Sequence, residues 1–106
     1  MPLQHQIIAR ALEIISEETK WTRGAMARTA DGRPCASGHP RAVRFCAVGA
    51  LHRAASELLA ENAFHRASEA EHLVLAASHE LHGLPTINDM EGREAVIAMF
   101  KVALAS

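Results

Sequence analysis

The stretch Arg44-Phe45-Cys46-Ala47-Val48-Gly49-Ala50-Leu51 is apolar at every position except Arg44 and Gly49. Apolar side chains spread round the whole circumference of a helix indicate an element that its neighbours contact on several sides. The apolar pattern continues to Leu59, and Pro40 has the place that proline favours in a first helical turn. The stretch therefore predicts a central helix from Pro40 to Leu59.

Three further segments have apolar residues at the spacing of one-faced helices. They cover residues 3–18, 69–82 and 92–104. The middle one follows the capping-box pattern Ser68-Glu69-Ala70-Glu71 and stops before Gly83, and the last one follows the polar corner Asn88-Asp89. With the central helix, these segments predict four helices.

The segment from residue 22 to residue 40 lacks this spacing and contains three glycines and two prolines. Its Asp31-Gly32 dipeptide is typical of a tight turn, so we expect a short β-hairpin or an ordered loop between the first two helices. At 106 residues the chain is long enough to bury a core without a disulfide or a structural metal. The predicted fold is mainly α, a single four-helix domain covering residues 1–106.

The composition is that of an ordinary globular protein, with 49% hydrophobic and 22% charged residues. The N-terminus lacks the pattern of a signal peptide, and no apolar run approaches the roughly 18 residues of a membrane span. We therefore expect a cytoplasmic protein with no membrane contact. In that compartment Cys35 and Cys46 are expected to stay reduced.

The formal charge of -1 provides no overall positive field that would attract nucleic acid. A local patch of Arg41, Arg44 and Arg53 is the alternative. Arg44 and Arg53 lie nine residues apart, which is 180° round the predicted central helix, so the three side chains cannot share one face. Nucleic acid is therefore not an expected partner.

Cys46 is the residue with the clearest catalytic chemistry. Helix-borne cysteines act as nucleophiles where the helix N-terminus favours the thiolate. A helix that starts at Pro40 places Cys46 nearly two turns inside, where the dipole has faded and burial raises the pKa of the thiol. We predict a packed, inert thiol. The alternative is a cysteine-dependent hydrolase or transferase, with a histidine and Asn88 or Asp89 as helpers.

A metal site is a further alternative. The Glu69-x-x-His72 pair could supply two ligands, but carboxylate-bridged sites need that motif twice and the sequence holds one copy. The trio Cys35, His39 and Cys46 lacks the fourth ligand of a structural zinc site. We therefore expect no metal and no cofactor. The side chains that would form such sites are Glu69, His72, His79, His82, Cys35, His39 and Cys46.

Two local features point to packing and capping. Glycine at position 49 costs the helix about 1 kcal/mol relative to alanine, which predicts the close approach of another backbone or of a large side chain such as Trp21. The Asn88-Asp89 pair is expected to cap the last helix. Alternatively, one of the two side chains reaches back to backbone groups of the hairpin, or Asp89 pairs with Arg44.

Four elements, in order, carry a family resemblance. They are Trp21-x-x-Gly24, Asp31-Gly32, Arg44 to Leu51 and Asn88-Asp89. Their order and spacing resemble a family of small bacterial and phage proteins with a domain of unknown function, although Phe45 stands where tryptophan is more usual. The resemblance supports a single domain and groups Trp21, Cys46, Asn88 and Asp89 as a node, to which Arg44 and Gly49 are added as neighbours in sequence. It implies no activity.

The sequence thus favours a small cytoplasmic interaction or regulatory domain without catalysis. The expected partner is a second copy of the chain or another protein, because several predicted helices have an apolar face. Ile14 and Leu75 flank the main apolar faces and are the residues expected at a dimer contact.

Overall fold

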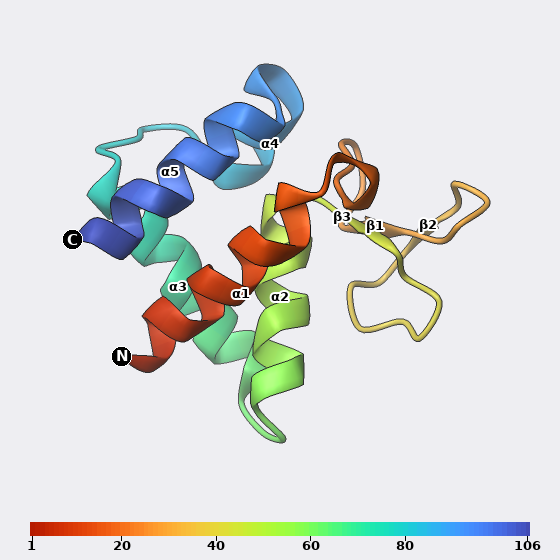
Figure 1. The fold of residues 1–106 in the computed structure, drawn as a ribbon, viewed down its shortest axis with the longest axis horizontal. Coiled ribbons are helices and arrows are strands. Elements are labelled where there is room, and N and C mark those ends of the chain that lie inside the picture. Colours follow the sequence, from red (N-terminus) through yellow and green to blue (C-terminus); the bar gives the residue numbers. More distant parts are fainter.

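The computed structural model describes residues 1–106 and contains five α-helices, a short 3-10 helix and a three-stranded sheet (Figure 1). The helices are α1 (Leu3–Ser16), α2 (Ala47–Leu58), α3 (Ala63–Ala77), α4 (Leu84–Glu91) and α5 (Arg93–Ala105), and the 3-10 helix is η1 (Glu18–Lys20). The strands are β1 (Ala27–Arg28), β2 (Pro34–Cys35) and β3 (Arg44–Phe45). The mainly α class is confirmed, whereas the prediction of four helices is wrong by one.

The core lies between α1, α2, α3 and α5. Helix α2 packs against α1 and α3, and α1 also packs against α5. The side chains of Ile7, Ile8 and Ile15 on α1 and of Phe100 on α5 are fully buried there. Small side chains let the backbones approach one another, since α2 and α3 contribute mainly alanines to the same core. These alanines are Ala47, Ala50, Ala54, Ala55, Ala67 and Ala70.

The three strands form an antiparallel sheet in the order β2-β1-β3, with Ala27 opposite both Cys35 and Phe45. In Figure 1 the sheet lies beside α2, on the side away from both chain termini. The hairpin expected between the first two helices is therefore present, with a third strand added. We call the segment Glu18–Phe45, which comprises η1 and the sheet, the sheet unit.

Helix α2 begins at Ala47, so the predicted start at Pro40 is wrong. Arg44 and Phe45 pair with β1, and this pairing keeps the backbone extended as far as Cys46, whose φ and ψ are -77° and 178°. Phe45 is buried because it joins the sheet, and an apolar residue at this position does not by itself distinguish a strand from a helix.

Helix α3 covers Ala63–Ala77 rather than residues 69–82, and the predicted capping box lies in its interior. The helix ends where His79 takes a left-handed conformation with φ of 53°. The N–H of His79 donates to the carbonyl of Ala76, and the N–H of Glu80 donates to the carbonyl of Leu75. This pair of hydrogen bonds is the Schellman closure, which here uses histidine where glycine is usual.

The expected polar corner before the last helix is itself a helix, α4. Gly83 precedes its first residue and Pro85 lies in its first turn, where a missing N–H costs nothing. A single residue, Gly92, then joins α4 to α5 with φ of 93°, a conformation that glycine adopts without strain. The segment has too few apolar positions to show helical periodicity, which explains why the sequence did not predict it.

Gly49 is the point at which the sheet unit touches α2. A Cβ atom added to Gly49 would lie 1.8 Å from the carbonyl oxygen of Met26, the same oxygen that accepts a hydrogen bond from the N–H of Cys46 at 3.1 Å. The residue against Gly49 is therefore Met26, through its backbone, and not the Trp21 side chain.

Replacing Gly49 with alanine should lower the free energy of unfolding by about 3 kcal/mol or more, because the atom in the way is a backbone oxygen that cannot rotate aside. Urea unfolding followed by circular dichroism measures the loss. Gly38→Ala is the matched control, since no heavy atom lies within 4 Å of the added Cβ. It should change stability by less than about 0.5 kcal/mol. Equal effects of the two substitutions would contradict the close approach.

Candidate functional site at the start of helix α2

Asn88 is the one fully buried polar side chain of the protein. Its Oδ1 accepts hydrogen bonds from Nε1 of Trp21 at 2.8 Å and from the N–H of Ala47 at 2.9 Å. Its Nδ2 donates to the carbonyl of Thr22 and to Oδ1 of Asp89, each at 3.1 Å. Both donors and both acceptor positions of the carboxamide are thus used, which a buried amide requires.

Asp89 makes a second link from α4 to the sheet unit. Its carboxylate accepts a hydrogen bond from the N–H of Gly24 at 3.0 Å, and its backbone carbonyl accepts one from Nη1 of Arg23. The pKa of this carboxyl lies below its usual value, mainly because of the hydrogen bond from the Gly24 N–H. The hydrogen bond from the Asn88 side chain is the next largest cause. The Arg23 guanidinium also lies over the Trp21 ring, 5.1 Å from its centre.

The structure therefore departs from two expectations about this pair. Asn88 and Asp89 lie within α4 and do not cap α5, whose preceding residue is Gly92. They reach back to backbone groups of the sheet unit, which was the alternative left open. The expected pair of Asp89 with Arg44 does not form, because Arg44 lies exposed on β3 and Arg23 approaches Asp89 instead.

Cys46 is the N-cap residue of α2, not a residue two turns inside it. Its Sγ accepts a hydrogen bond from the N–H of Gly49 at 3.3 Å. Burial raises the pKa of the thiol, the backbone N–H groups of Gly49 and Val48 oppose that rise, and the Asp89 charge adds to it. The side chain is only 5% exposed, so burial dominates and the sulfur stays a neutral thiol.

A hollow of about 250 Å³ lies next to this sulfur, lined by Gly24, Ala25, Met26, Cys46, Pro85 and Asp89. The two reactive groups that line this hollow, the Cys46 thiol and the Asp89 carboxylate, are unsuited to nucleophilic catalysis. A neutral thiol is a poor nucleophile, and a carboxylate whose pKa is lowered is a poor general base. No histidine bonds to the sulfur, so the triad-like arrangement that a cysteine hydrolase needs is not formed.

The side chains considered as candidate metal ligands do not form a cluster of three. No three His, Cys, Asp or Glu side chains of the protein are arranged to hold a metal ion. Cys35 and His39 line a hollow on the sheet unit, apart from Cys46, which lines the hollow beside α4. Both cysteines are free thiols.

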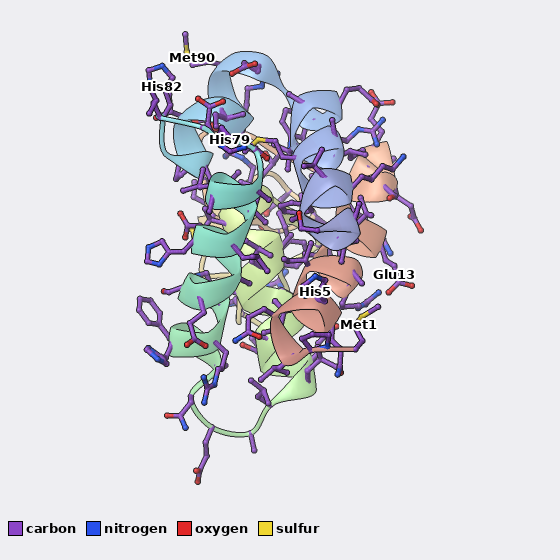
Figure 2. All side chains as sticks on the ribbon, turned by 90° about the vertical axis from the view of Figure 1, so that its left-hand side faces the viewer. Met1, His5, Glu13, His79, His82 and Met90 are labelled. Carbon is purple, nitrogen blue, oxygen red and sulfur yellow. The ribbon has the colours of Figure 1, made fainter.

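The other candidate set, which comprises Glu69, His72, His79 and His82, also forms no cluster of three ligands. Glu69 accepts hydrogen bonds from Arg66 at 2.8 Å and from Gln4 at 3.2 Å, and His72 is exposed further along α3. His79 and His82 lie beyond the end of α3 and far from His5 (Figure 2).

The feature that the sequence analysis missed is a separation of charge. Seven of the eleven lysines and arginines lie between Lys20 and Arg53, with Asp31 as the one acidic residue there, so this stretch carries a formal charge of +6 in a chain of total charge -1. The predicted central helix included Arg41 and Arg44, which separated them from Arg53. That placement is wrong, because Arg41 lies in a loop and Arg44 on β3. Counting charges by segment would have found the cluster.

We call these seven cationic residues the basic surface. Its members are Lys20, Arg23, Arg28, Arg33, Arg41, Arg44 and Arg53.

Two hollows open on this part of the molecule. One, of about 220 Å³, is lined by Arg10, Lys20 and Arg53 together with Glu57 and the apolar side chains Ile14, Ala42, Val43 and Phe45. The other, of about 400 Å³, includes Arg33 and Arg41 in its lining. Cationic side chains thus border both hollows.

Some of these cations are held by the protein itself. The Arg10 guanidinium contacts the Glu57 carboxylate at 2.7 Å, and Arg53 approaches the same carboxylate at 3.6 Å. The hydrogen bond from Arg10 is the main reason why the pKa of Glu57 is lowered. Arg53 also donates to the backbone carbonyls of Ser37 and His39, which ties the loop before β3 to α2.

The guanidinium groups of Arg41 and Arg44, in contrast, form no hydrogen bond and no ion pair within the chain, and both residues are exposed. They are the free cations of the basic surface.

A family model for a family of unknown function, DUF6197, matches residues 2–106. The chain therefore belongs to the DUF6197 family, and the expectation of a family of unknown function is confirmed. No curated protein and no solved structure matches the chain. None of its helices has the length and the apolar character needed to span a membrane.

Replacing Asn88 with alanine should lower the free energy of unfolding by about 3 kcal/mol or more, because the indole N–H of Trp21 and the N–H of Ala47 lose their buried acceptor. Trp21 is the single tryptophan, so its fluorescence during urea unfolding reports on this site directly. The control is Thr86→Ala at an exposed position of the same helix, which should be close to neutral. A loss below about 1 kcal/mol at Asn88 would contradict the role of the network.

Iodoacetamide should modify Cys35 in the native protein and leave Cys46 unmodified, because Cys35 is partly exposed and Cys46 is a buried neutral thiol. Mass spectrometry should show one adduct under native conditions and two after unfolding in urea. The variant Cys35→Ala should show none until it unfolds. Modification of Cys46 at the rate of Cys35 in the native protein would return it to the list of possible nucleophiles.

Proposed function

We propose that the chain is a non-catalytic interaction module whose helices form a scaffold and whose basic surface binds an anionic partner. The observation that carries the proposal is the separation of charge, with a formal charge of +6 between Lys20 and Arg53 in a chain of -1. Like charges that lie close together repel one another, and an anionic ligand relieves that repulsion.

The state of the other candidate groups supports a role without catalysis. Trp21, Asn88 and Asp89 spend their hydrogen-bonding groups on one another and on the backbone of the sheet unit. Cys46 is buried and its pKa is raised. These side chains hold the sheet unit against the helices, which is a structural task.

The free cations support a binding surface. An exposed arginine without a partner keeps its five donors for a ligand, and its planar fork matches the oxygens of a carboxylate, sulfate or phosphate. Arg41 and Arg44 stand three residues apart at the start of β3, where the loop is anchored by the bonds from Arg53 to Ser37 and His39. Because the loop is held in place, less ordering of the backbone is needed when a ligand binds.

A second copy of the chain is not the partner that we favour. The expected dimer contact included Ile14, but this side chain is buried within the single chain, and Leu75 is partly buried against the same core. The two side chains expected at a dimer contact are thus used in folding.

Chromatography on immobilised heparin, a sulfated polyanion, tests the proposal. At pH 8 and about 0.1 M salt, exposed charges act over about 10 Å. A chain with a net charge of -1 and no local basic surface should flow through under these conditions. We expect this protein to be retained and to elute as the salt concentration rises.

The variant R41Q/R44Q should elute at clearly lower salt. Its matched control is R66Q/K101Q, which removes two positive charges from α3 and α5, outside the basic surface. Circular dichroism should show both variants folded. Flow-through of the native protein, or identical elution of the two variants, would refute the proposal.

A further inference from the structure

We propose that the anionic partner is the phosphate backbone of a double-stranded nucleic acid, bound without readout of the bases. This inference rests on the proposed function and adds the class of the ligand. It also reverses the sequence-based expectation that nucleic acid is not a partner. That expectation relied on a helix that placed Arg44 and Arg53 on opposite faces, and Arg44 does not lie on that helix.

The charge pattern of the whole molecule fits a polyanionic rod. A duplex carries about one negative charge per 1.7 Å of its axis, and proteins bind it mainly by neutralising phosphates with lysine and arginine. The part of the chain from α3 to α5, residues 63–105, is acidic, with six acidic residues and three basic ones. A strongly negative rod therefore repels the helices α3 to α5 and attracts the basic surface, which orients the protein as it approaches.

The type of cation also fits phosphate. Six of the seven cationic residues of the basic surface are arginines, and Lys20 is the exception. Arginine presents parallel N–H donors that engage two phosphate oxygens at once, whereas lysine acts as a point charge.

The apolar content of the surface argues against an acidic protein as the partner. Protein interfaces depend on a buried centre of aromatic and large apolar side chains. The large apolar side chains exposed on the sheet unit are Met26, at 39%, and Val43, at 43%. Its aromatic residues are engaged, since Phe45 is buried beneath Arg53 and the Trp21 indole bonds to Asn88 and is covered by Arg23.

The same shortage of exposed aromatic rings argues against single-stranded nucleic acid. Proteins that bind single strands stack the bases on aromatic side chains, and each stack contributes about 1–3 kcal/mol. Without such rings, contact with phosphates is the interaction left to the basic surface, and a duplex offers phosphates at the highest density.

The cations most available to phosphates are Arg41 and Arg44, whose guanidinium groups form no hydrogen bond and no ion pair within the chain. Lys20 and Arg33 come next, because their ion pairs with Glu17, at 3.7 Å, and with Asp31, at 3.2 Å, lie between exposed side chains and are readily exchanged. The segment from Ala36 to Phe45 contributes residues to both cationic hollows. Phosphates can therefore be neutralised at two places along one segment.

Fluorescence anisotropy with a short labelled DNA duplex of mixed sequence tests the inference. With about four phosphates neutralised, the logarithm of the binding constant should fall with a slope of about -3.6 against the logarithm of salt concentration. A fourfold rise in salt should therefore weaken binding about a hundredfold. Two duplexes of unrelated sequence should bind equally, and a single strand should bind more weakly.

The variant R41Q/R44Q should reduce the magnitude of the slope by about two and weaken binding at least about tenfold at low salt. R66Q/K101Q makes the same change of net charge outside the basic surface and should leave the slope unchanged. A slope that changes equally in both variants would overturn the assignment of the contacts to the basic surface.

The outcome on heparin separates this inference from the proposed function. Retention on heparin that depends on Arg41 and Arg44, without binding to the duplex, would overturn the inference and leave the interaction module in place. Tighter binding to polyglutamate than to the duplex would also overturn it, in favour of an acidic protein partner. Failure to bind either heparin or the duplex would refute both proposals.

Discussion

The carboxamide of Asn88 is the interaction on which the arrangement of this protein depends. It joins three segments that are distant in sequence, namely Trp21 and Thr22 of the sheet unit, the first turn of α2 at Ala47, and its own helix α4. The sheet has three strands of two residues each and cannot be stable alone. A satisfied buried network costs little to bury and specifies one arrangement, whereas a partly satisfied one is strongly unfavourable. The polar network thus fixes where the sheet unit sits on the helices.

The backbone contact at Gly49 complements this network. Met26 can approach α2 because position 49 has no side chain, and the Met26 carbonyl then accepts the N–H of Cys46 just before the helix. Cys46 in turn caps α2 through its sulfur. The cysteine and the glycine of the opening stretch, which together resemble an active-site motif, therefore act in docking. Desolvation outweighs the favourable effect of the helix N-terminus on the thiolate, so the pKa of Cys46 is raised although the residue lies where reactive cysteines are often found.

Local sequence patterns predicted the class of the fold, the approximate helices other than α4, and the hairpin with its Asp31-Gly32 turn. They failed where tertiary contacts decide the local structure. Arg44 and Phe45 are extended because β1 pairs with them, and α3 ends at a left-handed His79 that no propensity rule selects. The grouping of Trp21, Cys46, Asn88 and Asp89 came from the family resemblance. Their hydrogen bonds could not be predicted, because the partners are up to 67 residues apart and α4 shows no periodic pattern.

Arg41 lies in a loop and Arg44 on β3, so neither belongs to α2. Arg53 on α2 lies over the Phe45 ring, whereas Arg44, the preceding residue of β3, lies exposed opposite Arg28 of β1. Arg28 and Arg53 spend their donors on Thr22, Gly32, Ser37 and His39, so they hold the loops of the sheet unit in place. The guanidinium donors of Arg41 and Arg44 make no hydrogen bond within the chain. The arginines that bond to the backbone hold the loops in place, so the loops lose little conformational entropy when a ligand binds to the free arginines. This preorganisation makes the sheet unit suited to binding anions.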